Sequence, residues 1–181
     1  MKGNKMSKFI RCHLVEAKPM TRGAYNKKRG WTVPANENPK DKGYIVKYPD
    51  GYISWCPKSQ FEAQGFPLED GTKITEKDVL NFVNLGYNSV STIQSRGGKP
   101  VTFVEREYPT GFTAFDTSAC VDPKNYSEEI GADTCSKRLN SSLWKCLGFM
   151  LQWATHGIVD IGMKYAKEQD AADAAAKKNQ H

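Results

Sequence analysis

The feature that most constrains the fold is a series of three short runs rich in aromatic and β-branched residues. They span 87–94, 101–107 and 112–118. The linkers between them contain Gly97-Gly98 and Gly111, and glycine adopts the positive φ values that tight antiparallel hairpins require. The sequence therefore predicts a three-stranded antiparallel meander. A helix over 76–84 is expected just before it, because Thr75 and Asp78 are spaced as a capping pair.

A long helical pattern follows the three runs. Asn125 and Glu128, three residues apart, are typical of a helix start. Apolar residues then recur at steps of about four, comprising Ile130, Leu139, Leu143, Leu147, Met150 or Leu151, Ala154 and Ile158. Such a stripe packs on a sheet, so the sequence predicts an α+β fold in which C-terminal α-helices cover an antiparallel sheet. Gly148 or the 140–142 run (Asn-Ser-Ser) is a candidate kink or break.

The first half of the chain has a hairpin pattern of its own. The runs 43–48 and 52–55 flank Pro-Asp-Gly at 49–51, a sequence typical of a tight turn. An edge strand is expected over 9–17, and short helices over 21–25 and 57–64. The segment 65–72 contains two glycines and a proline and predicts a boundary. We therefore expect an N-terminal module over 1–66, a sheet-and-helix domain over 67–162, and a flexible or helical tail over 163–181.

Positive charge is concentrated near the N-terminus. The 181-residue chain carries +6; residues 1–30 contain nine Lys or Arg and one Glu, and the remaining residues sum to −2. A basic segment of this kind binds nucleic acid or another anion by phosphate attraction, or it is a solvated surface. No run of 18 apolar residues occurs, and no apolar stretch follows the basic start. We expect neither a membrane span nor a secretory signal, and hence a cytoplasmic protein.

The sequence contains no motif of a common enzyme class. It lacks the G-x-S-x-G nucleophile elbow, the GxxxxGK[ST] phosphate loop and the HExxH metal motif. Its five cysteines and three histidines show no zinc-ligand spacing. We therefore expect no enzymatic activity, no metal and no cofactor, and we expect most of the cysteines to be small buried residues.

Aromatic and basic residues near the last hairpin and the helix start form the main candidate site. An aromatic ring stacks on a nucleotide base, while cationic groups and a helix N-terminus bind phosphate. The candidate ligand-binding residues are Phe112, Phe115, Asn125, Tyr126, Arg106, Arg138, Lys137 and Arg96. Core packing of the aromatic rings, and a plain glycine turn beside Arg96, are the alternative interpretations.

Two stretches resemble phage proteins. One runs Ser118-Ala-Cys-Val-Asp-Pro-Lys-Asn-Tyr-Ser-Glu-Glu-Ile-Gly131, preceded by Gly111-Phe112-Thr113 and followed by Leu143-Trp144 and Cys146-Leu147-Gly148-Phe149. It resembles, over about residues 75–155, a family of small tailed-phage accessory proteins. The other runs from Ala17-Lys-Pro-Met-Thr-Arg-Gly-Ala-Tyr-Asn26 through Tyr48-Pro-Asp-Gly-Tyr-Ile-Ser-Trp-Cys-Pro57 to Phe61. It is similar to a module found at the start of many phage proteins.

The resemblance implies a function. A sheet followed by C-terminal helices is similar to the layout of the phage anti-Thoeris sponges, which sequester cyclic ADP-ribose isomers, and in some cases cyclic oligonucleotides, without cleaving them. By analogy, the chain would be a homo-oligomeric counter-defence protein with ligand pockets at subunit junctions, acting in the cytoplasm of the infected host. The alternative is a nucleic-acid- or host-protein-binding module that uses the basic segment 1–30. No membrane partner is expected.

Overall fold

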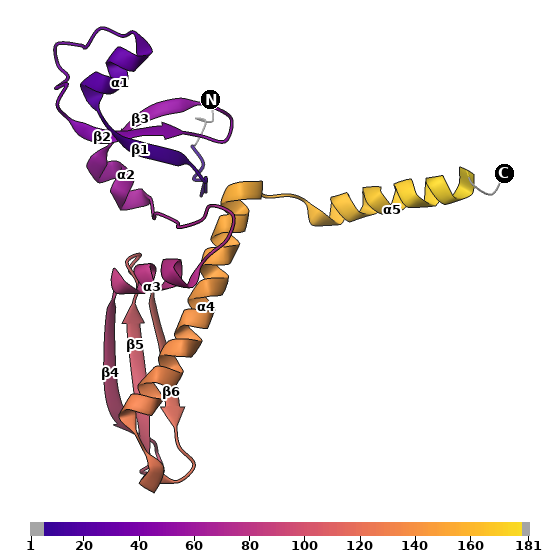
Figure 1. Cartoon of the computed structure of the whole chain (residues 1–181). Coiled ribbons are helices and arrows are strands. Elements are labelled where there is room, and N and C mark those ends of the chain that lie inside the picture. The colour runs from indigo at the N-terminus through magenta and orange to yellow at the C-terminus, as the bar shows by residue number, and fades with distance from the viewer. Residues whose placement is uncertain (1–5, 179–181) are drawn as a thin grey trace, which may run out of the picture.

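The computed structural model describes residues 6–178 and has an α+β fold, as the sequence predicts (Figure 1). These residues form two three-stranded antiparallel sheets and five α-helices. One sheet is formed by the first third of the chain. The other is formed by the middle of the chain and is covered by a long helix that follows it in sequence. Lys2 and Lys5 of the basic segment, and residues 179–181 of the expected tail, lie outside the described residues.

The N-terminal sheet has the strand order β1-β2-β3, formed by β1 (Glu16–Thr21), β2 (Lys42–Lys47) and β3 (Ile53–Pro57). The predicted hairpin between β2 and β3 is confirmed. The predicted edge strand over 9–17 was largely wrong, because residues 9–15 form no strand and the pairing with β2 runs from Glu16 opposite Lys47 to Thr21 opposite Lys42. Helix α1 (Arg22–Arg29) follows β1 directly and is longer than predicted, and α2 (Lys58–Gln64) follows β3.

The second sheet is the predicted meander, with the order β4-β5-β6. Its strands are β4 (Tyr87–Gln94), β5 (Pro100–Glu107) and β6 (Thr113–Ala119), and α3 (Glu76–Asn84) precedes them as predicted. Gly98 and Gly111 have φ values of +74° and +78° in the two hairpin turns. A short 3₁₀ turn, η1 (Pro123–Asn125), leads into α4 (Glu128–His156).

Helix α4 crosses the second sheet on one face, over β5 and β6 (Figure 1). Its cap is Ser127, whose Oγ accepts a hydrogen bond from the Ile130 amide, so the prediction of Asn125 as the cap was wrong. The helix runs without interruption through Gly148 and the 140–142 run, so the predicted kink is also wrong. Serine and asparagine are tolerated inside this helix because its packing on the sheet outweighs their weak helix propensity.

The buried face of α4 differs from the predicted stripe. Its buried residues fall at steps of four, comprising Gly131, Cys135, Leu139, Leu143 and Leu147. Ile130, Met150 and Ile158 are exposed. The start of the stripe was predicted wrongly because the buried residue there is Gly131. A glycine has no apolar side chain, so it does not show in a hydrophobic pattern. Two adjoining clusters make up this core, one of Val104, Cys135 and Leu139, the other of Ile74, Val79, Val83, Tyr108, Leu143 and Leu147.

A buried carboxylate joins the inter-module linker to α3. Asp78 accepts hydrogen bonds from the amides of Glu69 (2.9 Å) and Thr75 (2.8 Å) and from the Thr75 hydroxyl (2.8 Å). Burial opposes ionisation of this group, but the Thr75 and Glu69 amides outweigh it, so the pKa of Asp78 lies below its usual value. The predicted capping pair therefore also fixes the chain where it enters the second module.

The two modules meet at the C-terminal end of α4. The Leu14 amide donates a 3.3 Å hydrogen bond to the Ala154 carbonyl, one of the last four carbonyls of the helix, which have no partner within it. Beyond Gly157 the chain forms α5 (Ile161–Lys178), which projects away from both sheets (Figure 1). Residues 158–171 are exposed throughout.

Candidate ligand site

The two ends of the second sheet separate the aromatic residues of the predicted site. Phe112 is exposed in the β5–β6 hairpin and stacks on Tyr108, with 6.4 Å between ring centroids. Tyr126 lies at the other end, where its hydroxyl bonds to Thr92 (2.7 Å) and Thr102 (3.0 Å). Thr102 and Tyr108 are six residues apart along β5 and its end, about 20 Å at the rise of an extended strand. One chain therefore does not bring Phe112 and Tyr126 together.

The remaining aromatic candidate lies on the face of the sheet that α4 leaves open. Phe115 is exposed there and stacks on Phe103, with 5.9 Å between ring centroids. Its neighbours on β6 alternate between this face and the helix side, as strand geometry requires. Phe115 therefore lies on the opposite face of the sheet from Arg106 beneath α4 and from Arg138 on α4.

The two arginines occupy structural positions. Arg106 is 3 % exposed under α4, where its Nε donates to Asn88 Oδ1 and its Nη1 to Asn140 Oδ1, both at 2.6 Å. Arg138 binds Asp116, with 2.6 Å between Nε and Oδ2, and holds the pKa of that carboxyl below its usual value. Both guanidinium groups are thus already engaged by protein atoms.

The other three candidates are also dispersed. Lys137 pairs with Asp133 on α4, with 2.7 Å between Nζ and Oδ2. Arg96 lies exposed in the β4–β5 turn, and Asn125 ends the 3₁₀ turn before α4. The structure therefore does not assemble the eight predicted residues into one site within a single chain.

A close contact between α4 and β5 accounts for the glycine at position 131. Gly131 lies against Thr102 of β5, so that a Cβ at position 131 would be 2.1 Å from the threonine Oγ1. The Tyr126 hydroxyl bonds Thr102 and Thr92, and the Thr92 hydroxyl in turn bonds the Glu128 carboxylate. This polar cluster joins the start of α4 to β4 and β5, so Tyr126, Glu128 and Gly131 hold the helix on the sheet.

A cleft of about 470 Å³ lies between α3 and the middle of α4. Its volume is in the range of small-molecule sites. Eight residues line it: Glu76, Val79, Leu80, Lys137, Asn140, Ser141, Trp144 and Lys145. Trp144 is 42 % exposed, so part of its indole is accessible to a ligand. The lining thus combines an aromatic ring, two ammonium groups, an amide and a hydroxyl with one carboxylate.

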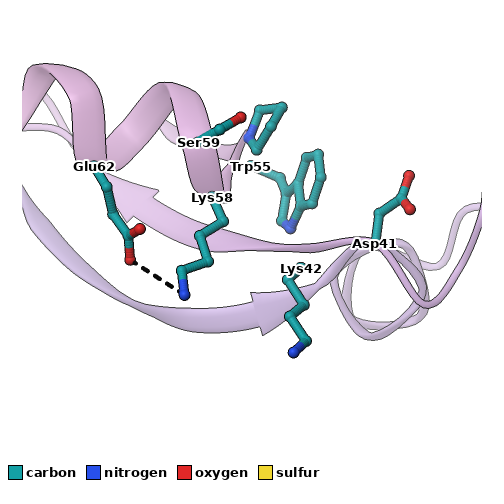
Figure 2. Close-up of a pocket in the computed structure, with 7 residues that line it drawn as sticks. Asp41, Lys42, Trp55, Lys58, Ser59 and Glu62 are labelled. Carbon is teal, nitrogen blue, oxygen red and sulfur yellow. Dashed lines mark ion pairs between the residues drawn. The ribbon is translucent and has the colours of Figure 1, made fainter.

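A second cleft, of about 510 Å³, lies in the N-terminal module (Figure 2). Trp55 is fixed there, because its Nε1 donates to the Met20 carbonyl at 2.9 Å and the Arg22 guanidinium lies 5.0 Å from the ring centroid. Asp41, Lys42, Pro57, Lys58, Ser59 and Glu62 complete the lining. Its lining contains two lysines and two carboxylates, and Lys58 pairs with Glu62 at 3.7 Å. This cleft therefore offers an anion less net positive charge than the α3–α4 cleft.

The sequence analysis predicted Lys137 as a ligand-binding residue but did not predict the cleft that it lines. Lys137, Asn140, Ser141, Trp144 and Lys145 fall at helical spacings of three and four, so they share one face of α4. That spacing was visible in the sequence. The position of α3 beside this face was not, because it depends on tertiary packing.

All five cysteines are free thiols, and Cys135 alone is buried, so the expectation that most of them are buried was wrong.

Within residues 6–178, no three His, Cys, Asp or Glu side chains gather in a way that could hold a metal ion. No helix in the same range is both long and apolar enough to cross a membrane.

Residues 72–155 match the model of the phage protein (N4 Gp49/phage Sf6 gene 66) family. The match runs from just before α3 to the last turn of α4 and so contains the whole second sheet and the α3–α4 cleft. It covers slightly less than half of the chain and supports a phage accessory protein. No curated protein and no solved structure matches the chain.

Proposed function

We propose that the chain is a phage counter-defence protein that binds a nucleotide-type anion in the α3–α4 cleft and sequesters it without cleaving it, in the host cytoplasm. The observation that carries this proposal is the lining of the cleft, where Trp144 lies with Lys137 and Lys145. An indole ring supports base stacking, and ammonium groups bind phosphate as point charges. Cyclic ADP-ribose isomers and cyclic oligonucleotides are the ligand class that the resemblance to phage sponges favours.

The energetics of the cleft suit a tight complex. Base stacking on an aromatic side chain contributes about 1–3 kcal/mol, and each hydrogen bond to a charged group about 1.5–3 kcal/mol. Nanomolar binding corresponds to about −12 kcal/mol. One stacked ring, the Lys145 ammonium and the Ser141 hydroxyl therefore supply part of what a stoichiometric sponge needs, and Lys137 adds to it by exchanging Asp133 for a phosphate.

Calorimetric titration with cyclic ADP-ribose isomers and with cyclic di- and trinucleotides tests the proposal. We expect Trp144→Ala to weaken binding roughly tenfold or more, in line with the loss of one stacking interaction. Phe149→Ala is the matched control, because Phe149 is an exposed aromatic residue of the same helix outside the cleft. Equal effects of the two substitutions, or the absence of binding to every ligand, would contradict the assignment.

Recovery of the ligand distinguishes binding from cleavage. After heat denaturation of the complex, mass spectrometry should find the cyclic nucleotide unchanged. A hydrolysed product that accumulates with time in the presence of the protein would show that the chain is an enzyme instead.

A second candidate function rests on the N-terminal module. Residues 6–66 contain eleven Lys or Arg and five Asp or Glu, so this module carries the positive charge of the chain. Lys27, Lys28 and Arg29 lie together in the last turn of α1, and the Arg29 guanidinium lies 4.9 Å from the centroid of the exposed Trp31 ring. Cations beside an accessible aromatic ring favour single-stranded nucleic acid as the partner.

Salt-dependent binding of a labelled oligonucleotide tests this alternative. For every phosphate that the protein ceases to neutralise, the slope of log K against log salt should fall by about 0.7–0.9. Neutralising residues 27–29 with glutamine should therefore flatten the slope, whereas Lys164→Gln with Lys167→Gln on α5 should leave it unchanged. A slope that is unaffected by the α1 substitutions would exclude this surface.

A further inference from the structure

Strand β4 forms an open edge of the second sheet. It is eight residues long and has neither a charged residue nor a proline. Three of its apolar side chains remain accessible: Tyr87 is 69 % exposed, Val90 46 % and Ile93 43 %. Figure 1 shows β4 at the outer side of the sheet, where α4 reaches it only near the start of the helix. Natural proteins usually protect such edges with charges, prolines or a covering element, because a free edge pairs with another strand.

The other three edges of the two described sheets carry such protection. Strand β1 contains Lys18 and Pro19, and β3 is short and ends in Pro57. Strand β6 has Asp116 at its centre, bound by Arg138, and Arg138 Nη2 also donates to the Thr117 carbonyl at 2.6 Å. A second strand arriving at β6 would meet a fixed ion pair and a backbone carbonyl that is already occupied. Only β4, of these four, is left open.

We propose that β4 pairs with β4 of a second copy of this chain, antiparallel and about a two-fold axis at Val90. Residues opposite each other in a sheet point to the same face. Val90 lies opposite Val104 of β5 and so belongs to the helix side, whereas Ser89 and Ser91 belong to the open side. Any two-fold register centred on a residue keeps the faces matched. Centring it on Val90 places that residue opposite its own equivalent and pairs residues 87–93, almost the whole strand.

This register matches the side chains by chemistry. Tyr87 lies opposite Ile93 of the second copy, an aromatic and β-branched pair of the kind that stabilises sheets, and Ser89 lies opposite Ser91. Asn88 lies opposite Thr92. The Asn88 Oδ1 already accepts from Arg106, so its amide group is left to donate toward the Thr92–Glu128 cluster of the second copy. Since the strand is uncharged, no like charges oppose one another.

The arrangement also closes. A two-fold interface between identical edges gives a dimer with one six-stranded sheet. The outer edges of that sheet are the two protected β6 strands, so no further chain adds to it. Both α4 helices lie on the same face of that sheet. Neither helix blocks the β4–β4 interface, because α4 packs mainly on β5 and β6. This inference does not depend on the ligand proposed for the α3–α4 cleft.

Paired substitutions test both the edge and its register by light scattering coupled to size-exclusion chromatography over a dilution series. We expect a dimer for the native chain. Ser89→Lys with Ser91→Lys places lysine opposite lysine twice and should give a monomer with native circular dichroism. Ser89→Lys with Ser91→Glu places opposite charges together and should restore the dimer. Thr113→Lys, on the edge of β6, should leave the dimer intact.

Three results would overturn the proposal: a native chain that is monomeric throughout the series, a folded Lys–Lys variant that still dimerises, or a folded Lys–Glu variant that does not. If the Lys–Lys variant fails to fold, Val90→Cys gives an independent measurement. A short bis-maleimide should then join two chains through position 90, as peptide mapping would show. The absence of that cross-link would equally overturn the two-fold register.

Discussion

Replacement of Gly131 by alanine tests the contact that holds α4 on the second sheet. A Cβ at this position would lie 2.1 Å from Thr102 Oγ1 and 2.6 Å from its Cβ, far inside normal contact distance, and Thr102 is fully buried. Relief requires α4 to move off β5 or Thr102 to leave its hydrogen bond with Tyr126. Overpacking of this kind costs about 1–3 kcal/mol, and the better helix propensity of alanine returns about 1 kcal/mol.

Gly148→Ala is the matched control for this substitution. Gly148 lies in the same helix, but a Cβ there would meet nothing within 4 Å. Urea denaturation followed by circular dichroism should therefore show Gly148→Ala to be stabilised by up to about 1 kcal/mol and Gly131→Ala to be destabilised. Thr102→Ala should recover part of the stability in the Gly131→Ala background, because it removes the clashing hydroxyl and methyl. If Gly131→Ala is as stable as Gly148→Ala, the close contact is not real.

Two further predictions concern charged groups. Arg22 and Asn26 bind the Glu37 carboxylate and lower its pKa from 4.5 to about 2. The stability that this group contributes is therefore complete above pH 4.5 and is lost as the pH falls toward 2. In thermal melts, Glu37→Gln should reduce the change of the melting temperature with pH across that interval. Asn140→Leu leaves Arg106 Nη1 buried without its partner and should cost about 1–3 kcal/mol in urea denaturation. Adding Arg106→Met should recover part of that loss, and a double variant no more stable than Asn140→Leu alone would refute the reasoning.

Local patterns predicted the elements but not every boundary. The capping pair at Thr75 and Asp78 predicted the start of α3, and the glycine-containing turns predicted the meander, because both signals act within a few residues. The start of α4 was misplaced because Asp122, Asn125 and Ser127 all have capping side chains. Asp122 caps the 3₁₀ turn and Ser127 caps the helix.

The candidate site was harder to predict because it depends on which faces the strands present. Residues 106 and 115 were assigned to one aromatic and cationic group, but Arg106 points under α4 and Phe115 points to the open face. Alternation along a strand separates residues by face even when their strands are neighbours. A sequence alone does not show which face the helix will cover.

The hydrogen bond between Leu14 and Ala154 bears on the order of assembly during translation. Its donor emerges from the ribosome about 140 residues before its acceptor, on the order of ten seconds earlier at common rates of synthesis. The N-terminal strands and helices have time to collapse long before the end of α4 exists, so the nascent chain must organise its first part without that contact. The bond then joins a segment made early to one made much later, and it can form only once synthesis has passed the end of α4.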